Sequence, residues 1–247
     1  MKWPFFVFIM LFMSCQSEKK SDLNIENINI LNDLDDLDGD GVENEFDLDS
    51  NTREGVPVDD NGVMLNPIYL DENNITIKAF DWAITGEIGI LNEVSYLIVD
   101  ESTLIDMVSE DSDVTNICTS KITLFSQLFF DKTEFNQDVS SWDTSNATAT
   151  NFMFNEASSF NQDISFWNTT KVTDMNYMFK NASSFDQNIR DWDTSNVILM
   201  REMFYGAQVF NQDLSSWNVI KVNDCQSVFI DTSSWTLPKP SFLNCNP

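Results

Sequence analysis

The chain has 247 residues and carries 40 Asp and Glu against 13 Lys and Arg, a formal net charge of −27 at pH 7. Nucleic-acid binding needs clustered basic side chains to neutralise phosphates, so this charge argues against DNA or RNA as a partner. The absence of histidine removes the commonest general base and transition-metal ligand. Hydrophobic residues make up 42% of the chain, with 20 Phe and 7 Trp, which predicts a sizeable buried core.

The N-terminus has the pattern of an export signal. One lysine precedes an apolar run from Trp3 to Met13, which is short for a membrane span and fits a signal-peptide core. The run ends in "LFMSC", which resembles the bacterial lipobox, although Phe12 stands where leucine is more usual. The resemblance implies a signal peptide over 1–14, a lipid on Cys15, and anchoring at a bacterial outer membrane or cell surface. The alternative is an ordinary signal peptide cleaved nearby.

A polar segment, residues 15–33, is rich in Asn, Ser and Asp and is expected to be a flexible tether. The acidic stretch "DLDGDGVENEFDLD" follows, within a segment that we place at 34–65. Its aspartates alternate, glycine permits a sharp bend, and a further aspartate stands at the twelfth position, which suits Ca²⁺. It resembles the calcium repeats of thrombospondin type 3 stalks; the alternative is a solvated acidic linker. The predicted structural Ca²⁺ ligands are Asp36, Asp38, Asp40, the carbonyl of Val42, Asn44, Asp47 and Asp49.

Residues 66–119 form a different unit, which we predict to be a small α/β cap. "NITIKAF" alternates apolar and polar residues and predicts a strand, and "EVSYLIVD" predicts a second, more buried one. "ESTLIDMVSE" predicts a helix after Asp100 and Ser102, which are plausible caps. The expected core face of this helix carries Leu104, Ile105 and Val108.

A short motif recurs at a constant interval in the C-terminal half. "FNQDVSSW" at 135–142 returns as "FNQDISFW" at 160–167, "FDQNIRDW" at 185–192 and "FNQDLSSW" at 210–217. A fixed period with apolar residues in register predicts a solenoid over 120–236, in which stacked coils bury each other's Phe and Trp. Within one repeat, the apolar spacing from Met175 to Ala182 predicts a short helix, with a strand-like piece near Val197.

The repeated aromatic and acidic residues are predicted to be structural. Trp167 and Trp192 share the phase of Phe and Met columns, which favours burial in the core over a sugar-stacking platform. Asp138, Asp163 and Asp213 repeat regularly, whereas an active site needs one asymmetric constellation. With the repeated Gln they are expected to form a polar ladder at the corners of the coils. We therefore predict that the protein is not an enzyme.

The stretch "MFKNASSFDQNIRDWDTSNV" and its sister copies closely resemble the BspA-type repeat, also known as the DUF285 repeat, over residues 120–235. This family is related to leucine-rich repeats, so the resemblance implies an α/β, leucine-rich-repeat-like solenoid with a small N-terminal capping unit. It also implies a cell-surface protein with a role in adhesion or recognition, and we expect its ligand to be a protein or glycan. We also expect the protein to be a monomer. The alternatives are a structural spacer of the envelope or an accessory to envelope glycan processing. Candidate ligand-binding residues, at positions that vary between repeats, are Phe166, Tyr177, Arg190 and Tyr205.

The repeats end in a region with two cysteines. Cys225 lies in the last coil and Cys245 lies beyond the prolines of "TLPKP", which prevent another coil from adding. We predict a disulfide between them that fixes a C-terminal cap over 237–247. Cys118 precedes the first full coil and is predicted to be free.

Overall fold

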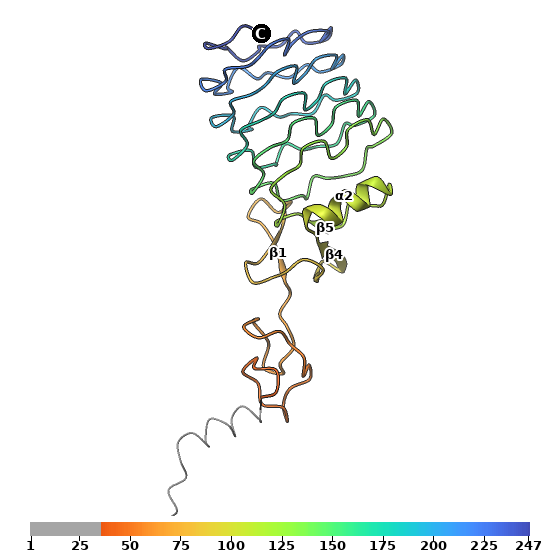
Figure 1. Cartoon of the computed structure of the whole chain (residues 1–247), viewed down its shortest axis with the longest axis vertical. Helices are drawn as coiled ribbons and strands as arrows, with labels where there is room; N and C mark the ends of the chain where they lie inside the picture. The colour runs from red at the N-terminus through yellow and green to blue at the C-terminus, as the bar shows by residue number, and fades with distance from the viewer. Residues whose placement is uncertain (1–35) are drawn as a thin grey trace, which may run out of the picture. The chain divides into compact units, whose positions relative to one another are not determined.

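A computed structural model of the chain describes residues 36–247. These residues belong to two compact units, the first ending at Val63 and the second running from Met64 to Pro247 (Figure 1). The predicted signal peptide, lipid site at Cys15 and tether lie outside the described residues. Among residues 36–247, no helix has the length and apolar character needed to cross a bilayer.

The first unit is built from turns and bends rather than from regular elements over residues 36–63. Its loops are shaped by carboxylates that accept backbone N–H groups, including those of Gly39 and Gly41. Val56 and Thr52 are its buried side chains in this range. A segment with so little apolar burial gains little from the hydrophobic effect.

The second unit begins with short strands. One antiparallel pair joins β1 (Ile68–Leu70) to β2 (Ile77–Ala79). A second sheet has the order β3-β4-β5, with β3 antiparallel and β5 parallel to the central β4. Its strands are β3 (Ile88–Leu91), β4 (Val94–Ile98) and β5 (Ile117–Cys118). The two strands predicted from the sequence correspond to β2 and β4, whereas β1, β3 and β5 were missed.

The helix α2 (Glu101–Ser109) connects β4 to β5. Asp100 is its N-cap and accepts the backbone N–H of Thr103 at 2.8 Å, as its position before the apolar periodic residues predicts. Leu104 and Val108 are buried, whereas Ile105 is 58% exposed. The prediction of Ile105 on the core face was therefore wrong: it follows Leu104 by about 100° around the helix axis and points away.

The repeats lie on one another, each copy against the next. Parallel bridges join equivalent residues of successive copies from Leu124 through Ala149, Asp174 and Leu199 to Asp224. Figure 1 shows this part as a series of similar coils stacked from the green segment to the blue C-terminus. Each copy therefore contacts its own equivalent residues in the next copy.

Each repeat is made of turns, and the short helix predicted over Met175–Ala182 does not form. Tyr177 and Asn181 have φ of 59° and 56°, in the left-handed region that no right-handed helix contains. The backbone N–H groups of Tyr177 and Phe179 donate to carbonyls of the next repeat, at 2.8 and 2.9 Å. These N–H groups bond the next repeat instead of the carbonyl four residues earlier, as they would in a helix. The spacing of apolar residues does not distinguish these two hydrogen-bond patterns.

The core of the second unit is made of aromatic columns. Phe154, Phe179 and Phe204 stack in turn with centroids 5.7 and 5.8 Å apart. Trp167 and Trp192 are 4% and 3% exposed and stack at 6.5 Å, so the prediction that the Trp column is core is confirmed. The indole N–H of Trp167 donates to the carbonyl of Val139 at 3.0 Å, so its polar atom is satisfied inside the core.

Asparagine and glutamine side chains join the corners of successive repeats. The side-chain oxygen of Asn161 accepts the backbone N–H of Asp186 at 3.0 Å. The Gln187 amide donates to the carbonyl of Asn161 at 2.8 Å, and Gln212 makes the equivalent bond to Asp186 at 3.1 Å. The predicted polar ladder is thus present for the glutamines, and it satisfies backbone groups that the turns leave free. The prediction was wrong for Asp138, Asp163 and Asp213, because each accepts the backbone N–H two residues further on in its own repeat.

The cysteines of the second unit are in two different states. Cys225 and Cys245 are joined by a disulfide with an S–S distance of 2.09 Å. Cys118 is free and buried, and burial raises the pKa of its thiol. Beyond the last repeat, the carbonyl of Pro238 accepts the N–H of Leu214 at 3.0 Å, so the tail covers the end of the coils.

Candidate functional sites

The first candidate site is the acidic loop of the first unit. Carboxylate oxygens of Asp36, Asp38 and Asp40 lie within 4.8 Å of one another. Asp36 accepts the N–H groups of Gly39 and Gly41, both at 2.9 Å, and these glycines have φ of 75° and 96°. The alternating aspartates converge because glycine permits the left-handed turns between them.

The carboxylates of Asp47 and Asp40 both lie beside Gly62. One oxygen of each carboxylate, Oδ2, is buried and has no hydrogen-bond partner among the described residues. Gly62 packs against both: a Cβ there would lie 2.1 Å from Asp47 Oδ1 and 3.2 Å from Asp40 Oδ2. Two buried, unpartnered carboxylate oxygens beside a backbone that admits no side chain fit a bound cation.

Electrostatics favour a cation at this place as well. The Val42 N–H lowers the pKa of Asp40, but desolvation and the negative charges of Asp38, Asp47 and Asp36 together raise it. A divalent cation would relieve this repulsion, and a hard ion such as Ca²⁺ takes oxygen ligands of this kind.

The remaining predicted ligands are engaged differently. The side-chain oxygen of Asn44 accepts the N–H of Leu37 at 3.1 Å and helps to close the loop. Val42 donates its N–H to Asp40 Oδ1 at 2.8 Å, and Asp49 donates its N–H to Asp47 Oδ1 at 2.8 Å. The structure therefore brings Asp36, Asp38 and Asp40 together and places Asp47 close to Asp40. The Val42 carbonyl, Asn44 and the Asp49 carboxylate stay predicted ligands.

The sequence did not point to Thr52 or Gly62 as part of this site. Thr52 donates its N–H to Asp38 Oδ2 at 2.6 Å and its hydroxyl to the carbonyl of Gly62 at 2.9 Å. It thereby links the aspartate loop to the later turn. The "DDNG" at residues 59–62 is a turn signal, but nothing in its spacing shows where that turn packs.

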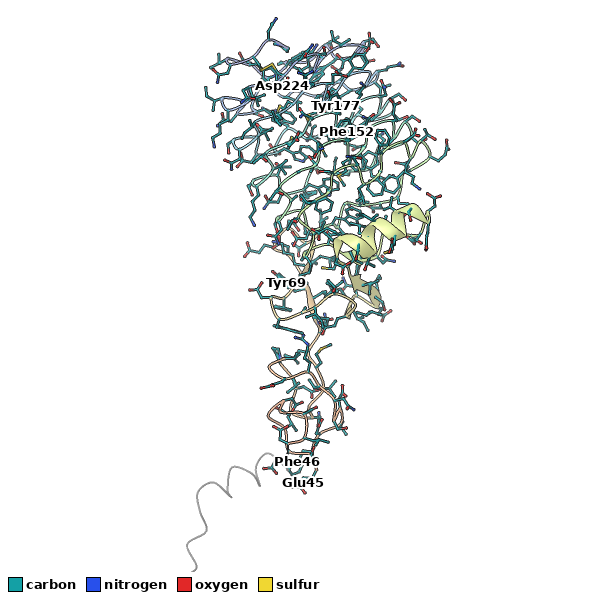
Figure 2. All side chains as sticks on the ribbon, viewed as in Figure 1. Glu45, Phe46, Tyr69, Phe152, Tyr177 and Asp224 are labelled. Carbon is teal, nitrogen blue, oxygen red and sulfur yellow. A yellow bond between two sulfur atoms is a disulfide. The ribbon has the colours of Figure 1, made fainter. Side chains whose placement is uncertain are left out.

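The second candidate site, which we call the aromatic strip, consists of Phe130, Phe152, Tyr177 and Tyr205. Phe152 and Tyr177 stack with centroids 4.4 Å apart, and Phe130 meets Phe152 edge-on at 6.4 Å. The Lys180 ammonium lies 5.4 Å from the Tyr177 ring centroid and 5.1 Å from that of Tyr205. Phe130 is 48% exposed and the other three rings are half-buried. Figure 2 labels Phe152 and Tyr177 on the stack of repeats.

Two rings of the aromatic strip stand on an unfavourable backbone. Phe152 and Tyr177 have φ of 60° and 59°, as do their equivalents in the other repeats, Gln127, Glu202 and Ser227, within about ten degrees. Bulky side chains rarely adopt this conformation, which costs on the order of 1–3 kcal/mol. The repeat imposes the backbone, but it does not require an aromatic residue, because three of the five copies have none.

Charged and polar groups border the aromatic strip. Lys180 binds Glu202 at 2.7 Å, which raises the pKa of the lysine, and Arg201 binds Asp224 at 3.0 Å. Asn155 occupies the position equivalent to Phe130 and Lys180 in its repeat. It is 5% exposed, and its side-chain oxygen is buried without a hydrogen-bond partner.

The other two sequence candidates lie elsewhere. Phe166 is 46% exposed and lines a small polar cavity of about 130 Å³ with Asp71, Lys78 and Asn168. Arg190 is exposed, and its carbonyl accepts the hydroxyl of Ser216 at 3.2 Å. The structure thus groups Tyr177 with Tyr205 and leaves Phe166 and Arg190 outside the aromatic strip.

Two members of the aromatic strip, Phe130 and Phe152, were missed from the sequence. Phe152 lies 25 residues before Tyr177, at the same position of the preceding repeat. The residue type at this position varies between repeats. Phe130 stands one repeat before Asn155, where the chemistry changes between copies. In both columns the residue type varies between repeats, and this variation is the sequence signal for Phe130 and Phe152.

The parallel bridges between successive copies and the shared aromatic core define a repeat protein. The family model described as "Mycoplasma protein of unknown function, DUF285" matches residues 101–207 and again residues 165–243, together more than half of the chain. The protein therefore belongs to the DUF285 family, as the motif resemblance predicted. No curated protein and no solved structure matches the chain.

Proposed function

We propose that this protein is a lipid-anchored bacterial surface protein whose repeats form a leucine-rich-repeat-like α/β solenoid. In this proposal the aromatic strip of the solenoid binds a protein or glycan ligand, and residues 66–119 cap its first coil. The lipid on Cys15 holds the folded part at the outer membrane or cell surface. Membership of the DUF285 family is compatible with this role.

The observation that carries the proposal is the pair Phe152 and Tyr177 on a left-handed backbone. The buried columns already supply the core, so two half-buried rings at a conformation unfavourable to them add little that the fold needs. Aromatic side chains are enriched at binding surfaces because they offer large area and lose little conformational entropy. The ion pairs Lys180–Glu202 and Arg201–Asp224 border the strip and offer polar groups that can orient a ligand.

Calcium is the second part of the proposal. Asp36, Asp38, Asp40 and Asp47 bind one Ca²⁺ ion, which supplies the positive charge that their buried oxygens need and ties the loops of residues 36–63 together. The role is structural: the ion orders a segment that buries little apolar surface. The proposal is supported by the two unpartnered carboxylate oxygens and by the exclusion of a side chain at Gly62.

Calorimetric titration of the whole protein with calcium tests this part. We expect one binding event with the native chain, and its loss in the double variant Asp40→Asn, Asp47→Asn. The matched control is Asp60→Asn, which removes an exposed carboxylate of the same unit. Equal heats for the native chain and the double variant would contradict the proposed site.

Ligand binding is tested on glycan and host-protein arrays. Phe152→Asn and Tyr177→Asn remove the rings while keeping a residue that tolerates the left-handed backbone. We expect binding to weaken at least tenfold in either variant, as for interface anchors. Gln127→Asn, at the equivalent position of another repeat, is the matched control and should bind like the native chain.

The arrays also separate the alternatives. Absence of binding on every array would favour a structural spacer of the envelope over a binding module. Binding that survives both ring substitutions would place the ligand elsewhere, and Phe166→Ala and Arg190→Ala would then test the remaining candidates. An accessory role in envelope glycan processing would require binding to envelope glycans in particular.

A further inference from the structure

The two ends of the buried phenylalanine columns are closed differently. We call the columns that begin with Phe129 and Phe135 the phenylalanine ladder. At its C-terminal end, Trp235 packs edge-on against Phe210 and Phe204, with centroids 4.7 and 5.2 Å apart. The Lys239 ammonium lies 5.2 Å from the Trp235 ring centroid. An aromatic ring with a cation beside it therefore covers this end.

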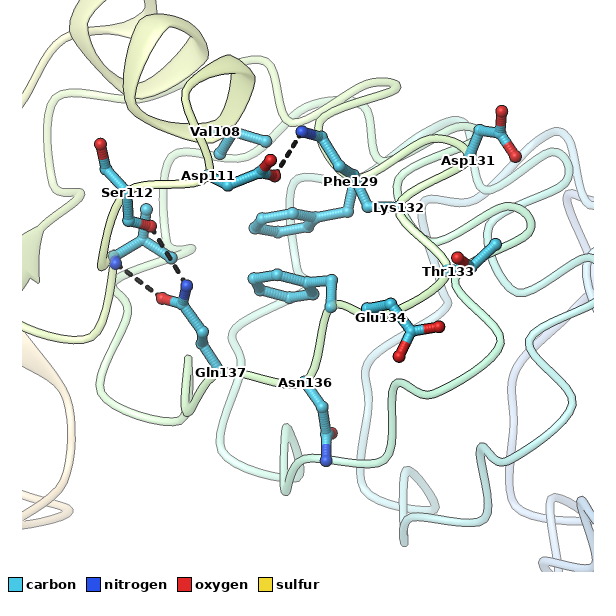
Figure 3. Close-up of a pocket in the computed structure, with 12 residues that line it drawn as sticks. Val108, Asp111, Ser112, Phe129, Asp131, Lys132, Thr133, Glu134, Asn136 and Gln137 are labelled. Carbon is cyan, nitrogen blue, oxygen red and sulfur yellow. Dashed lines mark hydrogen bonds and ion pairs between the residues drawn. The ribbon is translucent and has the colours of Figure 1, made fainter.

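The N-terminal end of the ladder opens into a cavity. Phe129 and Phe135 stack with centroids 3.7 Å apart and line a cavity of about 590 Å³, together with Val108 and Val114 near the end of α2 (Figure 3). Within residues 36–247, the ring contacts of Phe135 are with Phe129, Phe154 and Phe160. None of these comes from the segment that precedes the first repeat, and Phe135 stays partly exposed.

The cavity is preformed by hydrogen bonds in its wall. Gln137 accepts the N–H of Val114 at 2.7 Å and donates to the carbonyl of Ser112 at 3.1 Å (Figure 3). The amide of Gln137 is therefore engaged with the backbone on both sides. The ring of Phe135 and the two valines give the interior an apolar character, which favours an apolar group over a sugar with many hydroxyls.

The rim of the cavity is acidic. Asp111, Asp131 and Glu134 bring three carboxylates, and Lys132 is the cation among the lining residues. Lys132 binds Asp111 at 2.6 Å, which leaves Asp131 and Glu134 as uncompensated charges of the rim. The whole chain carries a net charge of −27, so attraction of a cationic partner is general as well as local.

We infer that this cavity binds an aromatic side chain of a basic segment in a partner protein. The ring stacks on Phe135 and continues the ladder by one step, at a spacing like the 5.7–5.9 Å between its own rings. The neighbouring basic side chains face Asp131 and Glu134. This site does not include the aromatic strip, so it goes beyond the proposed function and does not require it.

The test uses three capped probe peptides with the native protein at low ionic strength: Lys-Trp-Lys, Lys-Leu-Lys and Glu-Trp-Glu. Saturation-transfer NMR detects ring contact, and calorimetry gives the affinity. We expect Lys-Trp-Lys to bind and the other two to bind at least tenfold more weakly. Equal binding of Lys-Leu-Lys would overturn the aromatic part, and equal binding of Glu-Trp-Glu would overturn the basic part.

Variants assign the binding to the cavity. Phe135→Leu removes the stacking ring but keeps apolar bulk, and Ser112→Trp places a ring in the cavity; each should abolish the NMR signal. Asp131→Asn with Glu134→Gln should weaken binding at least fivefold. Asp191→Asn with Glu72→Gln removes two exposed charges elsewhere and should leave it unchanged.

A folding check accompanies each variant, because Phe135 touches the core. If Phe135→Leu fails to fold, Ser112→Trp and the rim pair still decide the question. Undiminished Lys-Trp-Lys binding in the folded variants would overturn the site. Capture of neutral oligosaccharides in the same cavity, blocked by Ser112→Trp, would overturn the proposed ligand class.

Discussion

The acidic segment at 36–63 and the repeats at 120–236 bury opposite kinds of side chain. In the described part of the acidic segment, Val56 is the one apolar side chain below 5% exposure, while oxygens of Asp40 and Asp47 are buried without partners. In the repeats, whole columns of Phe, Trp and Met are buried, and the indole N–H groups reach carbonyls. The two regions therefore differ in what is available to stabilise them.

In the repeats the source of stability is buried apolar area. Burial of one Phe stabilises by about 1.5–3 kcal/mol, and each repeat brings several such side chains. In the acidic segment neighbouring carboxylates repel one another, and we propose that a bound cation supplies the compensating charge. The two regions should therefore respond to different perturbations.

The largest effect is expected from the core of the repeats. Phe179 is fully buried and stacks on rings of both neighbouring repeats, at 5.7 and 5.8 Å. Phe179→Ala should lower the free energy of unfolding by about 3–5 kcal/mol, because it removes apolar area and leaves a cavity. Urea unfolding followed by tryptophan fluorescence measures this.

The control for this prediction is Phe166→Ala, which removes the same side chain from a position that is 46% exposed. It should change the free energy of unfolding by less than about 1 kcal/mol. Similar losses at both positions would mean that the aromatic columns do not dominate the stability of the repeats.

A smaller effect is expected from the disulfide at the end of the repeats. The bond between Cys225 and Cys245 closes a loop with a sequence separation of 20. The loop-entropy model gives roughly 3 kcal/mol for a loop of this length, so Cys245→Ser should lower unfolding stability by up to that amount. Calcium should not alter the loss, since the bond lies in the second unit. A calcium-dependent loss would contradict separate stabilisation of the two regions.

The smallest effect is expected from the ion pair of Asp71 and Lys78, and it depends on pH. The Lys78 ammonium, 2.9 Å away, holds the pKa of Asp71 below its ordinary value. Because the folded pKa is lower than the unfolded one, the pair's contribution is complete above about pH 4 and is lost as the pH falls through the folded pKa. Asp71→Asn should therefore cost less than about 1 kcal/mol at pH 6 and a smaller amount at pH 2.

Urea unfolding of the native chain and of Asp71→Asn at the two pH values makes the measurement. Glu72→Gln, at an exposed neighbouring position, is the control. If the difference in the free energy of unfolding between the native chain and Asp71→Asn were larger at pH 2 than at pH 6, the prediction would be contradicted.

The constant length of the repeats made them the most predictable part of the chain. Each residue of the core contacts its own copy in the next repeat, so phase alone predicts the Phe, Trp and Gln columns. Phase does not show where backbone N–H groups donate, and this is why a short helix was expected at Met175–Ala182. The left-handed residues Tyr177 and Asn181 show that the donors bond the next repeat instead.

Contacts that do not follow the repeat could not be predicted from the sequence. The approach of Gly62 to Asp40 and Asp47 joins parts of the first unit that share no pattern. The cavity at Phe135 depends on how the end of α2 packs on the first repeat, and no copy elsewhere in the described chain repeats that junction. The aspartate spacing, in contrast, was sufficient to bring Asp36, Asp38 and Asp40 together.

Hydrogen exchange along the whole chain, with and without calcium, compares the two regions most directly. In the acidic segment, the backbone N–H groups of Gly39, Gly41 and Thr52 donate hydrogen bonds to aspartate carboxylates. We predict that these amides exchange more slowly when calcium is present. The repeat amides, such as those of Phe179 and Phe204, should exchange slowly and equally in both conditions. Unchanged exchange at Gly39, Gly41 and Thr52, or calcium-dependent exchange in the repeats, would contradict two separate sources of stability.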